Sequence, residues 1–209
     1  MSSWWWIPSV VGAYLMGSLS FAVVVSRAMG LSDPRTYGSK NPGATNVLRS
    51  GSKKAAVVTL LLDALKGWLP VWLVLTYGAP LGLGAGTVAL VGLAAFAGHL
   101  YPVFFRFQGG KGVATASGVL LAYEPVLGLM VLLTWLGVAW VSRYSSLAAI
   151  VAAVVAPLYY LLAGGHWWRV EAPIALSMAV MGMALLWRHA ENMRRLLQGT
   201  EGRIGAKKT

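Results

Sequence analysis

Long apolar segments follow one another along most of this chain, and they constrain its fold more than any other feature. Five of them are residues 5–29, 53–77, 82–99, 145–163 and 173–187, separated by short polar stretches. The chain is 57% hydrophobic and only 11% charged, so its polar surface is too small to cover a soluble globule. We therefore expect an all-α, polytopic integral membrane protein built as a helical bundle.

Residues 112–142 form a further apolar stretch that is too long for one crossing of about 20 residues and short for two. Glu124-Pro125 divides it, because a residue before proline avoids the helical region. This predicts a short fourth segment and a fifth span over residues 125–141, and hence seven transmembrane segments. The first apolar run lacks a basic leader and is longer than a signal-peptide core, so it is expected to be retained.

The basic residues favour the same count. With seven segments, fifteen of the seventeen lysines and arginines fall on one side of the membrane, and only Arg169 lies in an opposite loop, with Lys66 inside a helix. The positive-inside rule then places the N-terminus outside and the C-terminus in the cytoplasm. We expect one transmembrane domain over residues 1–209, with a short basic tail from about residue 188. The net charge of +11 is attributed to topology and anionic lipid rather than to nucleic acid.

The most informative polar interruption is GSKNPGATNVLR, residues 38–49, which contains no acidic residue. Glycines, a proline and hydroxyl and amide side chains surround Lys40 and Arg49, so the backbone can turn sharply and present several donors together. Such a turn suits a phosphate oxygen, although a solvated turn between helices has the same composition.

Other polar groups fall at the same predicted cytoplasmic face. They are the YPVFFRFQGGK stretch of residues 101–111, Arg143 with Ser146, and the region of Arg188 and His189. A basic, carboxylate-poor ring at the bilayer edge suits a phosphorylated substrate that arrives from the cytosol while an acyl chain lies in lipid. We expect these groups to converge on one site.

Three stretches together resemble the signature motifs of the bacterial acyl-phosphate:glycerol-3-phosphate acyltransferases, the PlsY family. They are YGSKNPGATNVLRSG (37–51), GHLYPVFFRFQGGKGVAT (98–115) and RHAENMRRLLQGTE (188–201). The resemblance implies acyl transfer from a fatty acyl phosphate to the 1-hydroxyl of glycerol 3-phosphate, with release of lysophosphatidate and phosphate, in the bacterial inner membrane. It implies neither a metal nor another cofactor. Gln108 stands where a lysine is common in the family, and Lys40 where a small residue is common.

The resemblance also implies roles for individual residues. Ser39, Arg49, Lys111 and His189 would act in catalysis, with Lys111 contacting glycerol 3-phosphate. Substrate binding would involve Gly38, Asn41, Gly43, Thr45, Asn46, Gly98, His99, Gly109, Gly110, Ser146 and Asn192. The attacking hydroxyl would pass its proton to a phosphate oxygen of the donor, with His189 as the alternative base.

Three charged residues are expected to be structural neighbours of the site. Asp63 and Lys66, three residues apart on the second span, predict a buried ion pair facing the bundle, because unpaired charges there would each cost about 3 kcal/mol. Glu201 is expected to pair with nearby arginines. His99 has a second interpretation, as a helix-end histidine bonded to a loop carbonyl.

Two other functional classes bear on the same residues. Acyltransferases that use H-x-x-x-x-D are excluded, because Phe104, Glu171 and Arg194 stand five residues after the three histidines. A transporter of an organic phosphate is the alternative function, although no inverted repeat is visible. The sequence predicts neither the oligomeric state nor the acyl-chain preference.

Overall fold

The computed structural model describes residues 4–205, and in this part of the chain the regular structure is helical. The chain divides into two compact units, which are described separately: Met1–Tyr123 and Glu124–Thr209. Lys207 and Lys208, which contribute to the predicted basic tail, lie outside the described residues.

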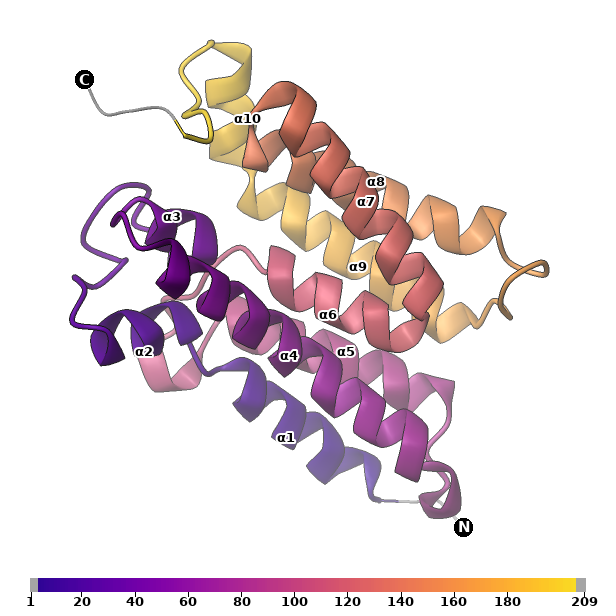
Figure 1. The fold of residues 1–209 in the computed structure, drawn as a ribbon. Coiled ribbons are helices and arrows are strands. Elements are labelled where there is room, and N and C mark those ends of the chain that lie inside the picture. Colours follow the sequence, from indigo (N-terminus) through magenta and orange to yellow (C-terminus); the bar gives the residue numbers. More distant parts are fainter. Residues whose placement is uncertain (1–3, 206–209) are drawn as a thin grey trace. The chain divides into compact units, whose positions relative to one another are not determined.

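In the first unit, the long helix α4 (Lys53–Tyr77) packs against α1 (Trp6–Gly17), α5 (Ala85–Leu100) and α6 (Val113–Tyr123), as Figure 1 shows. α4 begins at Ser52, whose Oγ accepts a hydrogen bond of 3.2 Å from the backbone N–H of Ala55 and so caps one free donor of the first turn. The helix continues through Pro70, as transmembrane helices often do where neighbouring groups compensate the lost bond.

Close helix crossings in this unit depend on glycines. A Cβ at Gly118 of α6 would overlap the backbone carbonyl of Ala64 in α4, and one at Gly67 would overlap that of Thr115. A Cβ at Gly98 of α5 would lie 2.8 Å from the backbone nitrogen of Ser18. Small residues let the backbones approach closely, which is how membrane helices pack without a hydrophobic driving force.

The sequence suggested one continuous helix over the first apolar run, residues 5–29, but the structure has two. α1 ends at Gly17, and α2 (Phe21–Ala28) follows at an angle of 45° after a break of three residues. The break carries Ser18 and Ser20, polar residues that compete with the helical backbone for hydrogen bonds. A short helix α3 (Ala44–Leu48), also unexpected, then forms inside the first polar motif.

Two single-turn 3₁₀ segments follow α4 and α5 in this unit, at Ala79–Leu81 and Val103–Phe105. The second one leads into the second polar motif. Its end residue Arg106 has a left-handed φ of 55°, and Phe107 has a φ of 59°. The chain therefore reverses sharply before it reaches Gly109.

The second unit contains α7 (Pro125–Ser142), α8 (Ser145–Leu162), α9 (Ala172–Arg188) and α10 (Ala190–Leu197). α8 packs against α7 and α9. Glu124 is extended, with φ −149° and ψ 111°, and Pro125 is the first helical residue, so the division predicted at this dipeptide is confirmed. Trp140, near the end of α7, is 84% exposed, which suits a surface that faces lipid.

Four helical segments are long and apolar enough to cross a membrane, or up to six if the bent pairs α1/α2 and α9/α10 each count as one. These account for six of the seven predicted segments. The remaining one is α6, whose 11 residues extend about 16 Å at 1.5 Å per residue, roughly half the thickness of the hydrocarbon core. The all-helical membrane fold is confirmed, while seven spans and their orientation stay predictions.

Candidate active site

Asn46 holds the first polar motif in shape. Its Oδ1 accepts a bond of 3.0 Å from the backbone N–H of Ser39, and its Nδ2 donates to the carbonyls of Pro34 at 2.6 Å and Tyr37 at 3.1 Å. The side chain is 2% exposed. Both amide hydrogens therefore bond to the loop itself, and Asn46, which the resemblance places among substrate-binding residues, supports the loop from within.

Two backbone positions of this loop are left-handed. Gly38 has φ 58°, and a Cβ there would overlap Oδ1 of Asn46, so only glycine fits. Lys40 has φ 55°, a conformation that costs a residue with a Cβ roughly 1–2 kcal/mol. This explains why a small residue suits position 40.

The side chains of Ser39, Lys40, Thr45 and Arg49 are exposed and available to a ligand. Gly43 precedes α3 in an extended conformation and Arg49 ends it. Asn41 is half-buried beside Gly43, where a Cβ would lie 3.1 Å from its Nδ2. The loop thus presents two hydroxyls, an ammonium and a guanidinium with no carboxylate among residues 38–49, which suits a phosphate group.

The second motif lies against the first. The backbone N–H of Gly110 donates a bond of 3.1 Å to the carbonyl of His99. A Cβ at Gly110 would lie 2.8 Å from the carbonyl oxygen of Pro42 and would overlap Nε2 of His99. Gly109 is equally confined by the carbonyls of His99 and Leu100. The two motifs therefore touch in the first unit through Pro42 and Gly110, which are 68 residues apart in the sequence, and half-buried Lys111 follows directly.

The predicted ion pair on α4 is confirmed. Nζ of Lys66 lies 2.8 Å from Oδ1 of Asp63, and both side chains are buried. Nδ1 of His99 is 3.7 Å from the same carboxylate oxygen. His99 thus ends α5 between the ion pair and the second motif, and its role in substrate binding stays a prediction.

In the second unit, Glu201 is the centre of a hydrogen-bond cluster. Its Oε1 accepts bonds from Ser146 Oγ at 2.7 Å and Asn192 Nδ2 at 2.6 Å, and its Oε2 pairs with Arg195 Nε at 2.7 Å. Burial alone would raise the pKa of Glu201, but the three hydrogen bonds and the charge of Arg195 outweigh it and lower the pKa below the usual 4.5. The predicted pairing of Glu201 with an arginine is confirmed.

His189 stands at the junction of α9 and α10, which meet at 54°. Its ring is 3% exposed, and Nδ1 lies 2.8 Å from the carbonyl oxygen of Leu185. A carbonyl only accepts, so Nδ1 carries a hydrogen and the ring orientation is fixed. Asn192 follows in the first turn of α10.

The sequence does not indicate three backbone groups that shape these clusters, the carbonyls of Pro34, Tyr37 and Pro42. Every residue type has the same backbone carbonyl, so the sequence could not indicate which carbonyls would take part. Among residues 4–205, no three His, Asp or Glu side chains group closely enough to hold a metal ion.

Known proteins with this sequence pattern share one description. A family model described as glycerol-3-phosphate acyltransferase matches residues 7–199. The glycerol-3-phosphate acyltransferase of Albidiferax ferrireducens is 60% identical over 207 residues, which are 99% of this chain and 92% of that protein. The one of Burkholderia pseudomallei strain 1710b is 63% identical over 201 residues, 96% of each chain.

Two solved structures are also similar. One is a crystal structure of PlsY, an integral membrane glycerol 3-phosphate acyltransferase, in its glycerol 3-phosphate form. It matches with a TM-score of 0.86 and 41% identity over 96% of each chain. The other is the lysophosphatidic acid form, with a TM-score of 0.85 and 40% identity over 96% of this chain and 95% of that one.

Proposed function

This chain belongs to the glycerol-3-phosphate acyltransferase family, and on that premise we propose that it transfers a fatty acyl group from an acyl phosphate to the 1-hydroxyl of glycerol 3-phosphate. The products are lysophosphatidate and inorganic phosphate, so the protein acts in phospholipid biosynthesis. The observation that carries the proposal is the contact between Gly110 and Pro42, which brings two phosphate-suited motifs together in one unit.

The first motif is the proposed site for the phosphate of the acyl donor. Ser39 and Thr45 offer hydroxyl donors, Arg49 offers a charged fork, and the glycines allow the backbone to approach the phosphate closely. Gly38 and Asn46 keep the loop in this shape. An acyl phosphate is a mixed anhydride with a good leaving group, so positioning two anions is the main task of the protein.

Lys111 is the proposed contact for the phosphate of glycerol 3-phosphate in the first unit. His189 and Asn192, to which the resemblance also assigns substrate roles, are the proposed ligands in the second unit. Lysine is a compact positive charge on a flexible stem, which suits a mobile polar substrate. Ser146 is proposed to bind the polar substrate from its place beside Glu201. The carboxylate of Glu201 orients both Ser146 and Asn192 and so supports them without touching substrate.

In the reaction, the 1-hydroxyl oxygen attacks the acyl carbonyl carbon and forms the new ester bond. The bond from that carbon to the bridging phosphate oxygen then breaks, and phosphate leaves. The hydroxyl proton moves to an oxygen of the departing phosphate. The bond between His189 and Leu185 holds the imidazole in a fixed orientation, which suits a phosphate ligand and also the alternative role of His189 as the base.

The proposed topology follows from the charges. Seven membrane segments place the N-terminus outside and the basic C-terminal region in the cytoplasm, with the site facing the cytoplasm of a bacterial inner membrane. Glycerol 3-phosphate is charged and therefore reaches the site from the aqueous side, while the acyl chain stays in lipid.

The direct test follows phosphate release from palmitoyl phosphate by the purified protein in a lipid mesophase, with and without glycerol 3-phosphate. We expect release that requires glycerol 3-phosphate and falls sharply in Lys111→Ala, but not in Lys54→Ala, which removes a lysine outside the motifs. Phosphate release that is absent in every lipid, together with saturable glycerol 3-phosphate uptake into proteoliposomes, would establish the transporter instead.

A further inference from the structure

A buried ion pair lies inside α4, beside the end of α5 and the break between α1 and α2, and the proposed reaction does not use it. The side chains of Lys66 and Asp63 are 2% and 3% exposed, and their charged atoms are 2.8 Å apart. Buried charges in a membrane helix are expensive even when paired, and a well-packed apolar pair is often at least as stable. The position of the pair points to a task other than stability.

Asp63 holds both ends of the segment that contains the second motif. Its carboxylate lies 3.7 Å from Nδ1 of His99, the residue that precedes this segment. Its backbone carbonyl accepts a bond of 3.0 Å from Oγ1 of Thr115, which follows the segment. One residue of α4 thus closes the base of the loop formed by residues 100–114.

His99 transmits this placement to the loop. Its carbonyl accepts the N–H of Gly110 at 3.1 Å, and its ring lies directly against the α-carbon of Gly110. A shift of the imidazole therefore moves Gly110 and the adjoining Lys111. The His99 side chain thus lies between Asp63 and Gly110, the residue before Lys111, which is the proposed glycerol 3-phosphate contact.

Lys66 extends in the other direction, toward the scaffold of the first motif. Its Nζ donates a bond of 2.6 Å to the carbonyl of Leu19 and lies 5.7 Å from the centre of the Phe21 ring. Leu19 lies in the break between α1 and α2, where the helical pattern of backbone hydrogen bonds is interrupted. Lys66 therefore fixes the position at which α2 begins.

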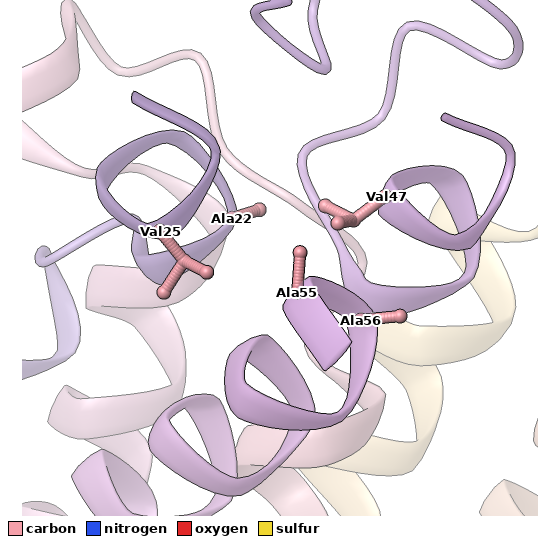
Figure 2. Packing of buried hydrophobic residues seen from close by; sticks show 5 residues of the cluster. All are labelled: Ala22, Val25, Val47, Ala55 and Ala56. Carbon is pink, nitrogen blue, oxygen red and sulfur yellow. The ribbon is translucent and has the colours of Figure 1, made fainter. Parts of the chain in front are cut away.

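α2 in turn supports α3. Figure 2 shows Ala22 and Val25 of α2 beside Val47 of α3, with Ala55 and Ala56 at the start of α4 completing a buried cluster. Val47 follows Asn46, the residue that shapes the phosphate loop. The position of the first motif thus depends on α2, and through α2 on Lys66.

We propose that the Asp63–Lys66 pair is a positioning device that sets the first motif relative to the second. The inference rests on the proposed function, since it assigns the donor phosphate to one motif and glycerol 3-phosphate to the other. Because the reacting atoms of two bound anions must meet within a narrow range, one rigid link between their loops has a direct effect on rate.

The main test replaces both charges with polar or apolar groups of similar size, in Asp63→Asn/Lys66→Met. The control is Arg169→Met/Glu171→Gln, which neutralises an exposed pair outside the three motifs. We expect the test variant to fold and its kcat/KM for acyl transfer to fall about ten- to a hundredfold, while the control stays at the wild-type value.

A second test leaves the charges in place. Thr115→Val removes only the bond to Asp63, so it should raise KM for glycerol 3-phosphate several-fold and leave KM for palmitoyl phosphate unchanged. Thr134→Val is its control, because the Thr134 hydroxyl bonds to Met130 of its own helix and to Tyr159, both residues of the second unit and outside the signature motifs. If the double variant does not fold, the Thr115 result decides.

A folded double variant with wild-type kcat and KM would overturn the inference, and so would an unchanged KM in Thr115→Val if the double variant is unfolded. A merely structural pair would lower the melting temperature and the folded yield without altering the kinetics of the folded fraction. Wild-type protein that fails to transfer acyl groups would instead refute the proposed function, so the two failures are distinguishable.

Discussion

Replacing Gly110 with alanine tests the contact between the two polar motifs most directly. The new Cβ would lie 2.8 Å from the carbonyl oxygen of Pro42, whereas ordinary contacts begin at 3.4 Å. The Pro42 carbonyl is backbone and must move by roughly 0.6 Å, the difference between these distances, and the buried His99 imidazole is displaced as well. Such a shift separates the loops that carry the two proposed phosphate sites.

The expected consequence is a kinetic loss larger than the loss of stability. Misplacement of reacting groups by about 1 Å costs up to 10²-fold in rate, and overpacking costs about 1–3 kcal/mol of folding free energy. We therefore expect Gly110→Ala to reduce kcat/KM by roughly 30- to 100-fold. Phosphate release from palmitoyl phosphate with glycerol 3-phosphate measures the rate, and thermal unfolding in detergent measures stability.

Gly137→Ala is the matched control. Gly137 lies inside α7, and a Cβ there would meet nothing within 4 Å. This variant should keep full activity and gain up to about 1 kcal/mol of helix stability. The reasoning is refuted if Gly110→Ala folds and retains kcat/KM within about twofold of the control.

Three further variants probe the loop and the Glu201 cluster. Lys40→Gly relieves the strain of the left-handed backbone at this position and should raise the melting temperature by a few degrees, corresponding to about 1 kcal/mol. An unchanged melting temperature would contradict the inferred backbone strain. Asn46→Ala removes three loop hydrogen bonds and should destabilise the protein by roughly 2–3 kcal/mol, measured by thermal unfolding, whereas the exposed Thr45→Ala should not. The folded-state pKa of Glu201 lies below 4.5, so its ionised carboxylate stabilises the folded protein above pH 4.5. This stabilisation is lost as the pH falls through the folded-state pKa. Wild type should therefore lose stability over that acidic range more steeply than Glu201→Gln, and parallel pH profiles would contradict this.

Local sequence patterns predicted most of the helices because they depend on the chain itself. The span over residues 53–77 agrees with α4 at both ends, since Ser52 supplies a cap that is readable from its identity. The division at Glu124-Pro125 follows from the steric restriction before proline. The break between α1 and α2 was missed, because apolar composition is the same on both sides and the break is stabilised by Lys66, 47 residues away.

The three signature motifs determined the family and the chemical character of the site. Phosphate binding needs glycines, hydroxyls and basic groups, and these residue types can be identified directly in the sequence. Only the tertiary structure decided which partners those groups have within the protein. Among the predicted substrate contacts, Asn46 bonds to its own loop, while Asn192 and Ser146 both bond to Glu201. The sequence determines which hydrogen-bond donors are present, but each donor bonds to the acceptor that the fold brings within about 3 Å. For His99 that geometry places the buried Asp63–Lys66 pair on one side and Gly110 on the other, an arrangement that no local pattern encodes.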